Sequence, residues 1–141
     1  MDPDLGISVA IACEFEPSFD IEDFVRHVLP LKSISHGSFE FTFVDADTIL
    51  TLNEAHLDHD YVTDIITFNL GTPEEIFGDI YICVEKAAEN AALYGQSLEE
   101  EIKLLIIHGI LHLLDYNDVT AEEKSVMDLE QYRLLELVQH A

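Results

Sequence analysis

The residues best suited to chemistry lie in the stretch HGILHLLDYNDVTAEE, residues 108–123. His108 and His112 are four positions apart in a run of leucines and isoleucines, so a helix places both imidazoles on one face. A buried imidazole without a polar partner costs free energy, and H-x-x-x-H spacing is a standard way to hold two ligands on one metal ion. Two core histidines bonded to carbonyls or carboxylates are the plainer alternative.

Asp118, six residues after His112, is the third candidate ligand. A helix that ran on would rotate Asp118 away from the histidine face, so the helix must stop near Leu114 and the chain must turn back. Thr120 and Glu123 have the capping-box spacing that starts a new helix, which requires such a break. The sequence therefore predicts that His108, His112 and Asp118 hold one metal ion.

The array also has the spacing of the extended zinc signature H-E-x-x-H-x-x-G-x-x-H, with two departures. Gly109 stands where that signature has its catalytic Glu, so the motif brings no general base of its own. A glycine there lets another backbone or a ligand come close. Asp115 stands at the turn glycine, and Asp tolerates a positive φ better than most residues do.

Residues 1–141 are expected to form a single domain that positions this array. Hydrophobic periodicity and capping signals predict an α+β fold, in which a mixed four-stranded sheet packs with about five helices. The expected strands cover residues 7–15, 37–45, 63–70 and 77–84, and the expected helices cover 20–30, 45–56, 85–95, 97–114 and 120–138. A polar loop is expected over residues 56–62.

Composition limits the location and the partners. The chain has 29 Asp and Glu against 6 Lys and Arg, a net charge of −23, which repels polyanions at long range. We expect no membrane or DNA partner, although such a charge also suits a high-salt habitat. Cys13 and Cys83 form no metal-binding or redox pair, so we expect two small buried side chains and a reducing, cytoplasmic setting.

The segment HGILHLLDYND resembles the signature His-Gly-x-Leu-His-Leu-x-Gly-Tyr-Asp-His of the YbeY family of bacterial metal-dependent endoribonucleases. Upstream, LNEAHLDHDYVTDIITF and GDIYICVEKAAENA are similar to two further blocks of that family, in the same order. The resemblance covers roughly residues 39–130. The matching residues around and after the motif are His108, Gly109, Leu111, His112, Leu113, Tyr116, Glu123, Met127 and Glu130.

The resemblance implies a single-strand-specific endoribonuclease that acts in 3′-end maturation of small-subunit (16S) ribosomal RNA and in ribosome quality control. It implies one Zn²⁺ per chain, single-stranded or ribosomal RNA as substrate, and ribosomal small-subunit proteins as further partners. The chain has Asp118 where the family has its third histidine, and two imidazoles with a carboxylate suit Zn²⁺ as well as Fe, Ni or Mn. Leu57 stands at a family arginine that is thought to help with RNA, so the bidentate phosphate contact is missing.

Other site residues are assigned less sharply. Asp115, Asp64 and Asp79 are candidates for the general base, and the sequence does not rank them. His56, His59 and Thr63 are candidates for substrate binding, although a polar loop of this kind is more often only a solvated turn.

The acidic composition keeps two other functions open, because tight RNA binding normally uses several Lys or Arg contacts. One is a zinc metallohydrolase of another substrate class, protease-like in its spacing. The other is a non-catalytic, metal-stabilised module of the ribosome assembly machinery.

Overall fold

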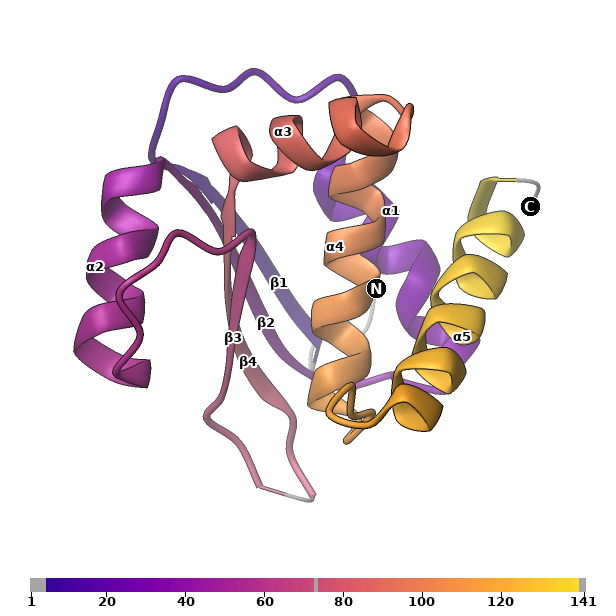
Figure 1. The fold of residues 1–141 in the computed structure, drawn as a ribbon. Coiled ribbons are helices and arrows are strands. Elements are labelled where there is room, and N and C mark those ends of the chain that lie inside the picture. The colour runs from indigo at the N-terminus through magenta and orange to yellow at the C-terminus, as the bar shows by residue number, and fades with distance from the viewer. Residues whose placement is uncertain (1–4, 73, 140–141) are drawn as a thin grey trace.

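The computed structural model describes residues 5–72 and 74–139. In this part of the chain, four strands and five α-helices follow one another in the expected order (Figure 1). They are β1 (Leu5–Ile11), α1 (Ile21–Val28), β2 (Gly37–Val44), α2 (Ala46–Leu57), β3 (Ile65–Asn69), β4 (Phe77–Cys83), α3 (Val84–Tyr94), α4 (Leu98–Leu113) and α5 (Ala121–Gln139), with a 3₁₀ helix, η1 (Leu29–Lys32), after α1. None of the helices in the described residues is both long and apolar enough to cross a membrane.

The sheet is mixed, as predicted. Its strand order is β1-β2-β4-β3, with β1, β2 and β4 parallel and β3 antiparallel to β4 at one edge. In Figure 1, α2 covers one face of the sheet, and α1, α4 and α5 lie on the other. The α+β fold class is therefore confirmed.

Strand alternation divides the apolar side chains between the two faces. Phe39, Phe41 and Phe43 of β2 are buried in the large core shared with α1, α4 and α5. Val44 and Cys83 belong instead to a small cluster beneath α2. Cys83 is buried as expected, but Cys13 is only partly buried, because it follows the exposed end of the edge strand β1.

Two glycines set how closely α4 lies on the sheet. A Cβ at Gly109 would lie 3.2 Å from Ile80 Cδ1 and 3.3 Å from Ile65 Cδ1. On β4, a Cβ at Gly78 would overlap the Leu113 side chain. Gly109 therefore makes room for side chains of the sheet, and not for a backbone or a ligand as the sequence suggested. This close packing directs the histidine face of α4 along β3.

Helix caps set the chain reversal after α4. Ser97 Oγ accepts from the Glu100 amide at the start of α4, and α4 ends at Leu113. The turn residue Asp115 has φ +69°, the left-handed conformation expected at this position. Thr120 and Glu123 then form both hydrogen bonds of the predicted capping box, at 3.0 and 3.1 Å.

The predicted loop over residues 56–62 begins too early. Helix α2 runs one residue past the predicted range 45–56, to Leu57, and it ends where Asp58 adopts the left-handed conformation with φ 56°. Aspartate is tolerated at such a position but marks it less clearly than glycine does, so the sequence signal for the helix end was weak.

Candidate metal centre

The structure brings the three predicted ligands together. The Nε2 atoms of His108 and His112 are 3.0 Å apart, and Asp118 Oδ2 lies 3.7 Å from the first and 3.6 Å from the second. The two imidazole planes are nearly perpendicular, at 83°. Within the described residues, this is the group of His, Cys, Asp or Glu side chains whose ligand atoms converge closely enough for one metal ion.

The other nitrogen of each imidazole is already engaged. His112 Nδ1 lies 3.0 Å from the carbonyl oxygen of Tyr116, and His108 Nδ1 lies 3.0 Å from Gln131 Oε1 on α5. A carbonyl oxygen only accepts, so each Nδ1 carries a hydrogen, and in the neutral form of each ring the lone pair is on Nε2. Two lone pairs and a carboxylate oxygen therefore face one small volume, which is the donor set that a divalent metal requires.

The environment of His108 favours its metal-binding form. Burial among apolar side chains of α4 lowers the pKa of His108 below its ordinary value, and the neighbouring His112 acts in the same direction. The neutral imidazole is the form that ligates a metal, so this shift favours the ligating form of His108.

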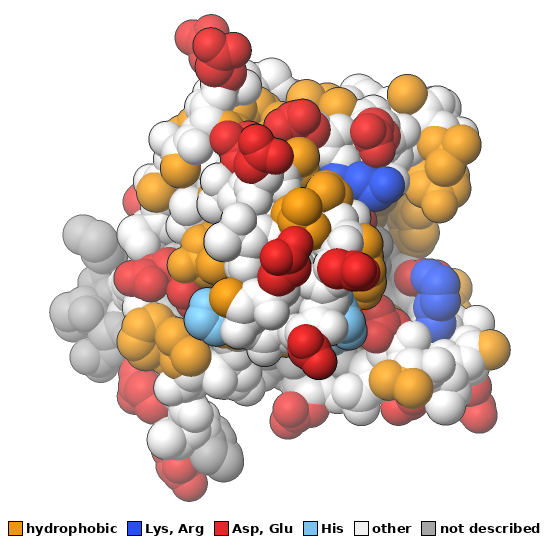
Figure 2. Space-filling view, turned by 60° about the vertical axis from the view of Figure 1, so that its left-hand side comes forward, with side chains coloured by type: hydrophobic (Ala, Val, Ile, Leu, Met, Phe, Trp, Pro, Cys, Tyr) orange, Lys and Arg blue, Asp and Glu red, His pale blue; other side chains and the backbone are white. Residues whose placement is uncertain are grey.

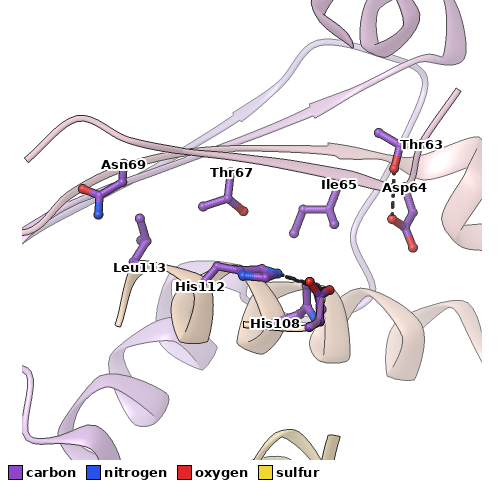
Figure 3. Close-up of a pocket in the computed structure, with 9 residues that line it drawn as sticks. Thr63, Asp64, Ile65, Thr67, Asn69, His108, His112 and Leu113 are labelled. Carbon is purple, nitrogen blue, oxygen red and sulfur yellow. Dashed lines mark hydrogen bonds and ion pairs between the residues drawn. The ribbon is translucent and has the colours of Figure 1, made fainter. Parts of the chain in front are cut away.

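The three residues line a pocket of about 450 Å³ between β3 and α4. Ile65, Thr67 and Asn69 alternate along β3 and point toward α4, where His108 and His112 form the opposite wall (Figure 3). Thr63 and Asp64 complete one end. The pocket therefore offers hydroxyl, amide and carboxylate groups beside the three metal-ligand atoms.

Comparison with known proteins assigns the family. The family model for Endoribonuclease YbeY matches residues 13–139. The chain belongs to the Endoribonuclease YbeY family. An Endoribonuclease YbeY of Elusimicrobium minutum is 41% identical over 104 residues, which cover 70% of this chain and 73% of that protein. The Endoribonuclease YbeY of Flavobacterium psychrophilum is 33% identical over 133 residues, or 90% of this chain and 95% of that protein. The fold of a Thermotoga maritima protein, solved in solution, matches with a TM-score of 0.65 at 26% identity, covering 94% of this chain and 88% of that one.

The general-base candidates separate clearly in this YbeY-family structure. Asp64 lines the metal pocket and accepts a hydrogen bond from Asn90 Nδ2 at 3.0 Å. Asp79 does not line this pocket, because it alternates with Gly78 and Ile80 on β4 and accepts from Tyr81 on the face that α2 covers. Asp115 is also misplaced. It is exposed in the turn and lines a different hollow, beside the start of α5.

Of the candidates for substrate binding, one reaches the pocket. Thr63 lines it, next to Asp64. His56 packs edge-on against Phe68, on the α2 side of the sheet, and His59 stacks on Tyr61. Neither histidine is among the residues that line the metal pocket.

Sequence reasoning missed Gln131, which positions His108. A usable signal exists, because Gln131 falls between Met127 and Leu134, two buried residues on the inner stripe of α5. A polar side chain on a buried stripe needs a partner, and here the partner is an imidazole. Thr67 and Asn69 were also missed, although they share a strand face with Ile65 by simple alternation.

A cluster of charged side chains fixes the turn after α4, where the carbonyl of Tyr116 contacts His112. Lys32 donates to the Tyr116 hydroxyl at 2.8 Å and pairs with Glu130, which Arg133 also contacts. The hydrogen bond from Arg133, and to a smaller extent that from Lys32, lower the pKa of Glu130 to about 2. Tyr116 is thus fixed from η1 and α5 while its carbonyl fixes His112.

Proposed function

We propose that this protein is a metal-dependent, single-strand-specific endoribonuclease that acts in 16S ribosomal RNA 3′-end maturation and in ribosome quality control. The observation that carries the proposal is the pair of Nε2 atoms 3.0 Å apart beside a carboxylate, in a chain of the Endoribonuclease YbeY family. A pocket of about 450 Å³ has the size of a small-ligand site. It therefore suits one nucleotide and its phosphate better than a base-paired helix.

His108, His112 and Asp118 would hold one ion, Zn²⁺ being the first choice, with Fe, Ni and Mn also suited to two imidazoles and a carboxylate. When bound, such an ion lowers the pKa of water to about 7 and polarises a phosphoryl oxygen. The side chains of Thr63, Thr67 and Asn69 line the same pocket and can donate hydrogen bonds to phosphate oxygens.

We assign to Asp64, which lines the pocket, the role of taking a proton from the attacking oxygen. Asn90 and Thr63 hydrogen bond to its carboxylate, which fixes its orientation beside the metal ligands. A carboxylate held in this way can accept a proton from a water or from an RNA 2′-hydroxyl as that oxygen attacks phosphorus.

The negative net charge of the protein weakens its electrostatic attraction to RNA. Figure 2 shows acidic side chains over much of one face and few basic ones. With 6 Lys and Arg in the chain, electrostatic attraction to RNA is weak. The basic proteins of a ribosomal small subunit would supply the missing attraction, which is why we include them as partners.

Protease-like chemistry has less support. The position that carries a catalytic Glu in the zinc-protease signature is Gly109, which packs against Ile80 and Ile65 in the core. A third candidate function, a metal-stabilised assembly module without catalysis, shares the same site and differs only in turnover.

The test is metal-dependent cleavage of a fluorescein-labelled, unstructured RNA oligomer by the full chain, with metal content measured by elemental analysis. His112→Ala should lose both metal and cleavage, whereas His36→Ala, an exposed histidine outside the pocket, should keep both. Cleavage of an unstructured peptide with intact RNA would instead establish the protease-like function. A metal-loaded protein that cuts neither substrate would establish the non-catalytic module.

A further inference from the structure

A second hollow adjoins the metal pocket. It has a volume of about 470 Å³ and is lined by side chains from α3, α4 and α5. The two hollows share Asp64, Ile65 and His108, so they meet at the metal centre. We call this second hollow the tyrosine groove, after Tyr94 and Tyr132, which both line it.

The two tyrosine rings are unusually accessible for large aromatic side chains. Tyr94, the last residue of α3, is 71% exposed, and Tyr132 on α5 is 55% exposed. Tyr132 is also the direct neighbour of Gln131, which holds His108. Exposed aromatic rings beside a nuclease centre are the usual platforms for unpaired bases, because every base presents a π-face.

The side-chain charges that line the groove favour binding of an uncharged base over binding of a phosphate. Its one cation, Lys124, is paired with Asp128 at 3.2 Å. Two further carboxylates, Asp64 and Glu101, line the groove and disfavour an anion there. Apart from His108 and the tyrosine hydroxyls, the remaining polar lining consists of side-chain amides, which can hydrogen bond to base edges without charge. These amides belong to Asn90, Gln96 and Gln131.

We propose that the tyrosine groove binds an unpaired nucleobase of the strand that enters the metal centre, stacked against Tyr94 and Tyr132. This inference rests on the proposed function, and it adds the subsite by which the strand is held. Stacking does not depend on ionic attraction, so it gives an acidic chain a means of binding RNA that its few cations do not provide.

The experiment measures binding and cleavage separately, with the metal-loaded chain. The binding probe is a fluorescein-labelled 2′-O-methyl cytidine hexamer, and the matched probe is a hexamer of abasic residues with the same phosphates. We expect the first to bind and the second to bind at least tenfold more weakly. Because the chain has 5 Tyr and no Trp, stacking should also quench its intrinsic tyrosine emission.

Substitutions then locate the stacking. Tyr94→Ala and Tyr132→Ala should each weaken binding by roughly five- to tenfold, the lower part of the range for base–aromatic stacking. Tyr94→Phe and Tyr132→Phe should keep binding, since the ring and not the hydroxyl is required. Leu93→Ala and Leu129→Ala are the controls, because both side chains are highly exposed on the same helices but do not line the groove.

The outcomes separate this proposal from the nuclease function. RNA cleavage by the original chain with an unchanged KM in both Tyr→Ala variants would overturn the base subsite and leave the nuclease standing. Equal affinity for the cytidine and abasic hexamers, or no binding of either, would also overturn it. Tyrosine-dependent binding without cleavage of RNA would support the subsite and remove the nuclease function.

Discussion

Replacing Gln131 with alanine should weaken metal binding without touching a metal ligand. Gln131 Oε1 lies 3.0 Å from His108 Nδ1, and this contact holds both the tautomer and the orientation of the ring. His112 has a main-chain partner, the carbonyl of Tyr116, which no substitution removes. The variant Gln131→Ala therefore isolates the contribution of one supporting hydrogen bond.

The structure sets the size of the effect. Loss of a group that orients a metal ligand typically costs ten- to a hundredfold in metal affinity, or about 1.4–2.7 kcal/mol. The His108 side chain is 22% exposed, so water can partly replace the lost amide. We therefore expect the lower value, about tenfold. Gln131→Glu should instead bind the metal several-fold more tightly, because an ionised acceptor makes a stronger hydrogen bond to the imidazole.

The assay is competition for Zn²⁺ against a chromogenic chelator. Gln139→Ala, an exposed glutamine on the same helix, is the control and should match the original protein. Far-UV circular dichroism of the metal-free proteins checks that the fold is kept. Equal affinities of Gln131→Ala and the original chain would show that Gln131 does not orient His108, and the order Glu, then Gln, then Ala would support the reasoning.

Three further predictions address other parts of the site. Asp118→His should retain one metal per chain by elemental analysis, because the 43% exposed Asp118 has room for an imidazole; loss of metal in a folded variant would show that this position does not hold the ion as proposed. Leu57→Arg should raise affinity for single-stranded RNA and steepen the log–log salt dependence by roughly 0.7; an RNA titration with unchanged affinity and slope would show that the end of α2 does not face the substrate. Glu130, with its pKa lowered to about 2, stabilises the fold above its unfolded pKa, and this contribution is lost as pH falls from about 4.5 toward 2. Glu130→Gln should therefore lower the free energy of unfolding at pH 7 by about 1–2 kcal/mol, allowing for the half-exposed Arg133, and denaturant titrations should show the difference shrinking in acid; a difference independent of pH would refute the assignment.

The convergence of His108, His112 and Asp118 could be predicted because the signals for it are local. The spacing of His108 and His112 fixes a shared helix face, and the capping box of Thr120 and Glu123 fixes where the next helix begins. Together these features require the reversal that returns Asp118 to the histidines. Each step depends on residues that are close together in the sequence.

Features that depend on packing between distant elements were not accessible in the same way. Whether Asp64 or Asp79 lies beside His108 and His112 depends on which side of the sheet α4 covers, and that follows from the fit of Leu113 over Gly78. The end of α2 was misplaced because an aspartate, and not a glycine, adopts the left-handed conformation at residue 58. In the first case the tertiary contact decides, and in the second the local backbone conformation of one residue does.

The contacts that orient His112 involve residues far apart in the sequence. Tyr116 contributes a carbonyl to His112 and a hydroxyl to Lys32, which lies 84 residues earlier in the chain. The Lys32 ammonium also lies 5.0 Å from the centre of the Tyr116 ring, so three contacts converge on one turn. Because Lys32 pairs with Glu130 of α5, the turn is fixed by the same helix that supplies Gln131 to His108. Both imidazoles are therefore oriented through the docking of α5. This helix helps to build the candidate metal centre, although His108, His112 and Asp118 all precede it in the chain.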